Sequence, residues 1–318
     1  MMSISPRKIL IVDKVSPSLI LDLTAHGFVC ETQLSITYQD FLNMPDEWYG
    51  LVIRSRFIVD KELIDSKSQL HFIARLGSGV ENIDTDYAKN KGIACISTPE
   101  GNAQAVAEHA LALLLCALKN VVKADKEVRQ GIWDREANKG HELSSLKVGI
   151  IGFGHTGPAF AKILHHFGIE IFVYDKYKSH LATDYVHEVD LYTLQQQCDV
   201  ISLHINYFAE NKYFINDIFW KNVEHNVIFL NTSRGNVVDT ASLVRQLHSG
   251  KVQYACLDVL EYESVNLKNV AIEQWSPTMY ELAHFPNVVL SPHIAGQTFE
   301  AEQKHADIAV QKILALGD

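Results

Sequence analysis

Short apolar runs alternate with helix-like segments through the first third of the chain. The runs are KILIVD from Lys8, FVCE, LVIRS, LHFIARLG and IACIS. Between the first two runs, residues 18–26 have helical spacing and close on Gly27. Strand-length runs separated by amphipathic helices are typical of a parallel sheet wrapped by helices. The pattern predicts a first α/β unit that ends near Pro99.

A long alanine- and leucine-rich segment follows, from Ala103 to about Arg129, with Asn102 before it as a candidate N-cap. It is too long for a strand and predicts a helix that crosses between two domains. A second series of runs begins at Lys147: KVGII, EIFVY, DVISLH, VIFLN and YACLD. Five strands in this order suit a doubly wound nucleotide-binding domain. One more strand, NVVLSPH, and a last helix at 299–316 are expected to return to the first domain.

The predicted fold class is α/β with two doubly wound, Rossmann-like domains. Residues 1–99 and 288–318 are expected to form a discontinuous, flavodoxin-like domain, and residues 100–287 a nucleotide-binding Rossmann domain. A chain of 318 residues, 47% of them hydrophobic, can fill two cores of this size.

Composition narrows the classes of function. The formal net charge is −10 and no block of lysines and arginines occurs, so a nucleic acid has no basic surface to meet. The five cysteines are scattered without a CxxC pair or a His/Cys cluster, which predicts reduced thiols and no metal site. The first residues lack the apolar core of a signal sequence, and no apolar run approaches a membrane span. We expect a cytoplasmic protein without nucleic-acid or membrane partners.

The strand KVGII leads into GFGHTG, a GxGxxG loop formed by Gly152, Gly154 and Gly157. Glycines let the backbone approach a pyrophosphate at the positive N-terminus of the next helix. The next strand ends on Asp175, where a carboxylate can accept both ribose hydroxyls of an adenosine and repel a 2′-phosphate. Strand, loop, helix and acid together favour NAD over a plain tight turn. Lys176, directly after the aspartate, leaves some use of NADP open.

Polar residues also follow the strands of the second series: His204 ends DVISLH, Arg234 follows VIFLN, Asp258 ends YACLD and His293 follows NVVLSP. In an open parallel sheet, ligands bind outside the carboxyl ends of the strands. A guanidinium there is costly to desolvate without an anion. A single histidine in such a place is more often an ordinary loop residue, unless a carboxylate partner exists. Glu263, on the loop after Asp258, is the candidate partner.

The chain closely resembles the D-isomer-specific 2-hydroxyacid dehydrogenases over nearly its whole length. The resemblance rests on six motifs in family order: RLGSGVENID at 75–84, STPEGNAQAVAEHA at 97–110, ELSSLKVGIIGFGHTG at 142–157, LNTSRGNVVD at 230–239, LDVLEYE at 257–263 and SPHIAG at 291–296. It implies an NAD-dependent oxidoreductase whose first domain binds the substrate.

Three catalytic residues are implied by this resemblance. Arg234 would hold the carboxylate and carbonyl of a 2-oxo or 2-hydroxy acid, His293 would act as the acid and base, and Glu263 would pair with His293. A bidentate guanidinium fixes the reacting carbon, and a histidine can carry a proton near neutral pH. The anion that Arg234 requires is then the substrate.

The remaining ligand contacts are implied in the same way, and Asp258 would help to anchor the carboxamide end of the cofactor. The implied cofactor-binding set is Gly152, Gly154, His155, Thr156, Gly157, Asp175, His204, Thr232, Ser233, Asp258 and Gly296. Backbone N–H groups of Gly77, Ser78 and Gly79 would bind the substrate carboxylate. From the local sequence alone, this turn is equally well a plain connection between a strand and a helix.

Basic residues of the first domain indicate which 2-hydroxy acid the protein binds. Arg54, Ser55 and Arg56, with Arg75 nearby, are similar to a segment that meets the substrate phosphate in phosphoglycerate dehydrogenases. Two arginines at i and i+2 of a strand end are otherwise simply solvated. We favour 3-phosphoglycerate and 3-phosphohydroxypyruvate as the substrate pair, as in serine biosynthesis. Glyoxylate or hydroxypyruvate reduction is the nearest alternative.

The resemblance also implies a homodimer formed through the cofactor domain and residues 103–133. Arg135 matches a basic position that reaches the neighbouring subunit's site. The usual HxPLT segment reads HINYF here, which places Asn206 and Phe208 where proline and threonine are common.

Two other classes of protein stay open. Some relatives of this family act as corepressors that sense NADH and keep the catalytic residues; such a protein binds NADH tightly and consumes it slowly. A methyltransferase also combines a glycine loop with an acidic strand end. That reading leaves Arg234, Glu263 and His293 without a role.

Overall fold

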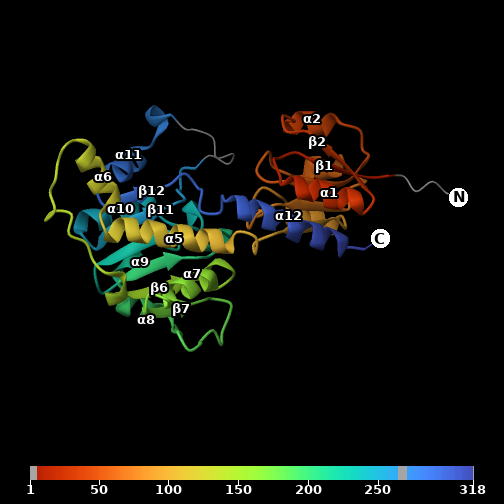
Figure 1. The fold of residues 1–318 in the computed structure, drawn as a ribbon. Helices are drawn as coiled ribbons and strands as arrows, with labels where there is room; N and C mark the ends of the chain where they lie inside the picture. The colour runs from red at the N-terminus through yellow and green to blue at the C-terminus, as the bar shows by residue number, and fades with distance from the viewer. Residues whose placement is uncertain (1–5, 264–270, 318) are drawn as a thin grey trace. The chain divides into compact units, whose positions relative to one another are not determined.

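The computed structural model describes residues 6–263 and 271–317 and divides the chain into two compact units (Figure 1). The first unit comprises Met1–Asn102 and Gln297–Asp318, and the second is Ala103–Gly296. We describe each unit separately.

The first unit is built on a five-stranded parallel sheet of order β2-β1-β3-β4-β5, the flavodoxin-like order that the sequence predicts. The strands are β1 (Arg7–Ile11), β2 (Phe28–Thr32), β3 (Trp48–Ile53), β4 (Phe72–Arg75) and β5 (Ala94–Ser97). The helices are α1 (Pro17–Ala25), α2 (Tyr38–Asn43), α3 (Lys61–Asp65), α4 (Thr85–Asn90) and α12 (Phe299–Leu314).

Alternating side chains of β1 fill a core on each face of this sheet. Leu10 joins the core shared with α2, α3 and α4, whereas Ile9 and Ile11 join the core under α1 and α12. α12 contributes Ala306, Ala309, Val310 and Ile313, an apolar stripe at helical spacing. α1 and α12 lie side by side (Figure 1).

The second unit is built on a seven-stranded parallel sheet of order β12-β11-β10-β9-β6-β7-β8. The strands are β6 (Lys147–Ile151), β7 (Glu170–Tyr174), β8 (Val186–Glu188), β9 (Val200–Leu203), β10 (Val227–Asn231), β11 (Val252–Leu257) and β12 (Val288–Leu290). The helices are α5 (Ala103–Leu118), α6 (Val121–Arg129), α7 (Thr156–His165), α8 (Leu191–Gln197), α9 (Asp217–Lys221), α10 (Thr240–Ser249) and α11 (Pro277–His284). The order reverses at β6, which is the switch point of a Rossmann sheet.

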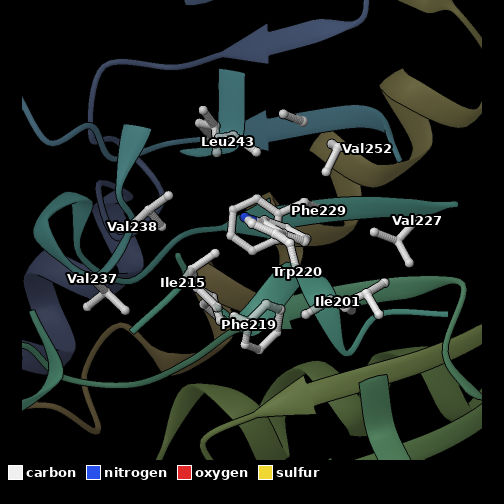
Figure 2. Packing of buried hydrophobic residues seen from close by; sticks show 14 of the residues in the cluster. Ile201, Ile215, Phe219, Trp220, Val227, Phe229, Val237, Val238, Leu243 and Val252 are labelled. Carbon is white, nitrogen blue, oxygen red and sulfur yellow. The ribbon is translucent and has the colours of Figure 1, made fainter. Parts of the chain in front are cut away.

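Buried side chains fill both faces of the second sheet. α5 and α7 cover one face, and the core on the other contains residues of α8, α9, α10 and α11. In the latter, Trp220 meets Phe229 edge to face with 5.4 Å between ring centroids, surrounded by aliphatic side chains from several elements (Figure 2). This rigid base positions the carboxyl ends of the strands.

Two sequence predictions about the boundaries are wrong. β12 does not return to the first domain: its three residues pair with β11 from Ala255 to Leu257, so the second unit continues to Gly296. The helix predicted from Ala103 is broken after Leu118, and α6 leaves it at 59°. α5 lies wholly in the second unit and packs on its sheet and on α7 instead of crossing between domains.

Among the described residues, no single helix is long and apolar enough to span a membrane. α5 and α6 reach that length and apolarity only as a bent pair.

Candidate active site

The glycine loop after β6 has the backbone that a pyrophosphate requires. Gly152 has φ of +95°, and a Cβ there would lie 2.5 Å from the carbonyl oxygen of His204. A Cβ at Gly157 would lie 2.3 Å from the carbonyl oxygen of Gly152, whereas one at Gly154 would meet no atom within 4 Å. The first and third glycines therefore fold the loop tightly, and the second leaves its outer side open at the N-terminus of α7.

His204 supports this loop from behind. It is buried, and its ring nitrogens meet Ser202 Oγ at 2.9 Å and Thr156 Oγ1 at 3.1 Å. Burial lowers the pKa of His204 to about 3, so the ring is neutral. We predicted His204 and Thr156 as cofactor ligands. In the structure the imidazole and the Thr156 hydroxyl are engaged with each other, and their part in cofactor binding stays a prediction.

Asp175 joins the ends of β6 and β7. One carboxylate oxygen accepts from Phe153 N at 2.7 Å, and the other accepts from Tyr177 N at 2.9 Å and Lys178 N at 3.0 Å. A carboxylate has about four acceptor positions. Three are used, which leaves room for one ribose hydroxyl where the sequence suggested two.

The residues present fit a bound NAD. Besides the open glycine loop and Asp175, the hydroxyl of Thr232, just past the carboxyl end of β10, is buried without a hydrogen-bond partner in the described structure. Among the other predicted ligands, Ser233 donates its hydroxyl to Asn231 Oδ1 at 2.9 Å, His155 is exposed beside α7, and Gly296 is half-buried.

Asn231 shapes the turn that presents Arg234. Its side-chain oxygen accepts from Ser233 N, and its amide nitrogen donates to Arg234 O, both at 3.0 Å. A Cβ at Gly235 would lie 2.0 Å from Leu260 O. Only glycine therefore lets this turn pack against the segment that ends at Glu263.

Glu263 and His293 form a direct pair. His293 Nδ1 lies 2.8 Å from Glu263 Oε2, and both side chains are about three-quarters buried. The other Glu263 oxygen accepts from Leu260 N at 2.6 Å, which fixes the carboxylate. With Nδ1 facing Glu263, Nε2 is the nitrogen left for a substrate.

Asp258 holds the backbone around His293. Its carboxylate accepts from Ser291 Oγ at 2.6 Å, Ile294 N at 2.9 Å and Ala295 N at 2.8 Å. Burial opposes ionisation, but these bonds and one from His109 outweigh it and lower the pKa of Asp258 to about 2. His293 itself has φ of +56°, which is uncommon for a residue with a side chain. The predicted anchor for the cofactor carboxamide is thus 1% exposed and binds its own chain.

His109, on α5, extends this network and was missed by sequence reasoning. Its Nε2 lies 2.8 Å from Ser291 Oγ and 3.4 Å from Asp258 Oδ1. The only signal was one histidine in a helix rich in alanine and leucine, which does not reveal a partner 182 residues away.

In the first unit, the glycine turn after β4 is held by Thr98. Gly77 N donates to Thr98 Oγ1 at 2.9 Å, and His305 Nδ1 lies 2.7 Å from the same oxygen. Burial, reinforced by the charge of Arg54, lowers the pKa of His305 to about 4. Gly77 N is thus paired within the unit, and its predicted contact with substrate stays a prediction. No hydrogen bond of Ser78 N or Gly79 N is seen within the described residues.

Asp13 organises the segment from Arg54 to Arg56. One of its carboxylate oxygens accepts from the backbone N–H groups of Arg54, Ser55 and Arg56, at 2.6–3.1 Å. Arg56 Nε donates to Val12 O at 3.0 Å and lies 3.4 Å from Asp13. Arg54 instead extends to Gln297 Oε1 at 3.1 Å.

Two further basic residues of the predicted substrate site differ in setting. The Arg75 guanidinium lies across Gly77, where a Cβ would meet it at 1.8 Å. Arg135 is exposed on the loop after α6. Within the described residues, no group of three or more His, Cys, Asp or Glu side chains is placed to hold a metal ion.

The strand order, the glycine loop at the switch point and the acidic residue after β7 define a dinucleotide-binding α/β protein. The chain belongs to the D-isomer specific 2-hydroxyacid dehydrogenase family: the profile of that family's NAD-binding domain matches residues 111–295. This confirms the predicted family, fold class and cofactor.

Named relatives differ in substrate. The chain is 32% identical to the D-3-phosphoglycerate dehydrogenase of Archaeoglobus fulgidus over 96% of its own length, but spans only 56% of that protein. It is 36% identical to the hydroxypyruvate reductase of Thermotoga maritima over 83% of each chain. The structure of D-lactate dehydrogenase from Aquifex aeolicus, complexed with NAD and lactic acid, superposes with a TM-score of 0.83 at 25% identity, covering 98% of this chain and 95% of that one.

Proposed function

We propose that the chain catalyses NAD-dependent interconversion of a D-2-hydroxy acid and its 2-oxo acid. The observation that carries this proposal is the 2.8 Å contact between His293 and Glu263, next to a turn that presents Arg234. The carboxylate fixes the orientation of the imidazole through Nδ1, which leaves Nε2 to exchange a proton with the substrate oxygen. When NAD is bound, it supplies the hydride chemistry.

Each protein group has one task in this mechanism. Arg234 binds the substrate carboxylate and carbonyl through its fork of N–H groups. His293 Nε2 gives a proton to the carbonyl oxygen during reduction and takes it back during oxidation. Glu263 holds the ring by Nδ1, while Asp258 holds the backbone that carries it. For the first unit, the N–H groups of Ser78 and Gly79 remain our candidates for binding substrate.

For the substrate, we favour the 3-phosphoglycerate and 3-phosphohydroxypyruvate pair, and hence serine biosynthesis. Arg54 and Arg75 at the ends of β3 and β4, together with the relative that matches 96% of this chain, support it. One observation favours the second candidate, hydroxypyruvate or glyoxylate reduction: Arg56 Nε is engaged by Asp13 and Val12, which leaves less of this guanidinium for a phosphate.

The test is NADH consumption with 3-phosphohydroxypyruvate, hydroxypyruvate, glyoxylate and pyruvate in parallel, for the wild type and for Arg54→Ala and Arg56→Ala. A preference for the phosphorylated acid that collapses in Arg54→Ala supports the first candidate. Equal rates with the unphosphorylated acids, unaffected by either substitution, support the second. Tight NADH binding without turnover of any acid would overturn the enzymatic proposal in favour of an NADH sensor.

We also infer a homodimer. α6 has no buried residue, and Val121, Val128, Ile132 and Trp133 are between 45% and 79% exposed. Four exposed apolar side chains on one short helix and the loop after it support a protein interface at this segment.

A further inference from the structure

A hydrogen-bonded bridge links the loops that follow β7 and β9. Glu210, in a short 3-10 turn (Ala209–Asn211), accepts from Lys176 Nζ at 3.2 Å and from the Tyr177 hydroxyl. Lys176 also lies over the Tyr177 ring, 5.1 Å from its centroid. β6 lies between β7 and β9 in the sheet, so the bridge connects the loops on either side of the glycine loop.

The bridge borders an open surface depression that is lined by Tyr177, Phe208, Ala209 and Glu210. Tyr177 and Phe208 are 70% and 53% exposed and offer flat apolar rings of the kind on which a purine stacks. Asp175, the ribose-binding candidate, comes two residues before Tyr177. The depression therefore lies where the adenosine end of the proposed nucleotide site is expected.

Lysines next to Asp175 are the groups that a 2′-phosphate would need, because a cation near this position accommodates the additional charge of NADP. Lys178 Nζ donates to Phe153 O at 3.0 Å. Lys176 is paired with Glu210, and the hydrogen bond to Glu210 raises the pKa of Lys176. The bonds from Tyr177 and Lys176 in turn lower the pKa of Glu210. Both partners are thus charged at neutral pH, and both lysines are occupied.

We propose that Glu210 is a specificity residue that excludes NADP. It holds Lys176 away from a 2′-phosphate and adds a second negative charge beside Asp175. The side chains are more than half exposed, so the effect comes from the sign and position of the charge and not from the strength of the ion pair. This inference rests on the nucleotide-binding part of the proposed function and is independent of the acid that is reduced.

The test is titration of the full chain with NADH and NADPH, followed by nucleotide fluorescence. Glu210→Gln keeps the shape of the side chain and removes its charge. We expect NADPH to bind Glu210→Gln about fivefold to tenfold more tightly than it binds the wild type. The affinity for NADH should change less than about threefold. Adding Lys176→Met to Glu210→Gln should cancel the gain. Glu170→Gln, which makes the same change of charge at the amino end of β7, is the matched control and should leave both affinities unchanged.

Unchanged NADPH affinity in Glu210→Gln would overturn the proposal, as would a gain that persists without Lys176 or that Glu170→Gln reproduces. If the wild type binds NADH and only the gain is missing, the proposed dehydrogenase stands without this specificity residue. If the wild type binds neither nucleotide, both proposals fail.

Discussion

Asp258 places two consecutive backbone amides, and through them the ring of His293. The carboxylate accepts from Ile294 N and Ala295 N while His293 N donates to Asp258 O at 2.8 Å. The left-handed backbone of His293 is therefore held on both sides by Asp258: its carboxylate binds the two N–H groups that follow His293, and its carbonyl binds the N–H of His293 itself. Geometry of this kind persists only when its surroundings determine it several times over.

We predict that Asp258→Asn lowers kcat by about tenfold to a hundredfold, because the amide keeps the size of the group but replaces one charged acceptor with a donor. The KM for the oxo acid should change less, since Arg234 is untouched. Steady-state kinetics measures both constants. Asp125→Asn, an exposed residue paired with Arg129, is the control and should leave kcat unchanged. An unaltered kcat in Asp258→Asn would show that the loop holds His293 without this carboxylate.

At the level of single residues, the sequence predicted those parts of the site that follow from the spacing of a motif. The glycines of the loop, Asp175 and the His293–Glu263 pair follow from motif spacing. The same spacing places His204 and Asp258 at strand ends without telling whether their side chains face a ligand or the protein. Both side chains are buried and bind protein groups, and their partners, such as Thr156 and Ser291, are distant in the sequence.

α2 is a helix of six residues and depends on a buried lysine. Lys67 is 1% exposed and donates from Nζ to Leu42 O and Met44 O, both at 3.0 Å, at the carboxyl end of the helix. Burial lowers the pKa of Lys67, with Asp46 acting in the opposite direction. The ammonium satisfies carbonyls that have no partner within so short a helix.

We predict that Lys67→Met lowers the free energy of unfolding by about 1–3 kcal/mol, because two part-buried carbonyls lose their donor. Urea denaturation followed by circular dichroism measures the loss. Lys89→Met, at an exposed position of α4, should stay within about 0.5 kcal/mol of the wild type. Equal stability of the two variants would mean that relief of the desolvated ammonium offsets the lost hydrogen bonds.

α6 provides a second prediction about an element. Replacing Val128 and Trp133 by serine should convert the proposed dimer into a monomer, because it removes exposed apolar area without touching either core. Light scattering after gel filtration gives the mass directly. Tyr192→Ser removes an exposed aromatic ring from α8 and should leave the dimer intact. A monomeric wild type would exclude this interface.

At the level of elements, run length and periodicity identified eleven of the twelve strands found in the described residues; β8 was missed, and β12 was assigned to the wrong sheet. β8 and β12 have three residues each, too few for a pattern to show which sheet they join. The break between α5 and α6 occurs at Asn120, which adopts φ of +53° and bonds Tyr254 on β11. That tertiary contact has no trace in the local sequence.

Each unit of the molecule contains one buried, neutral histidine: His204 in the second and His305 in the first. Their pKa values of about 3 and about 4 lie below the ordinary value of 6.5. As the pH falls below about 6.5, His204 and His305 become protonated in the unfolded chain but stay neutral in the folded units. Stability is therefore full above pH 6.5 and is lost progressively toward pH 4 for His305 and toward pH 3 for His204. Asp258 adds a further loss below its ordinary pKa of 3.8, toward about pH 2.

Between pH 6.5 and 4, we predict that His305→Gln loses about 3 kcal/mol less free energy of unfolding than the wild type. The substitution removes the titrating group while keeping a polar partner for Thr98. Denaturation at a series of pH values compares it with the wild type. His26→Gln, at an exposed position, should keep the full pH dependence. Parallel curves for His305→Gln and the wild type would contradict a neutral His305 in the folded state.

The second unit is one uninterrupted stretch, whereas the first is assembled from two pieces on either side of it. α12 contributes the stripe that covers Leu19 and Leu23, so the first sheet has one face incomplete until that helix exists. During synthesis the ribosome must make all of Ala103–Gly296 before α12 emerges. The inserted unit can therefore finish folding first, and the unit that contains the beginning of the chain is completed last.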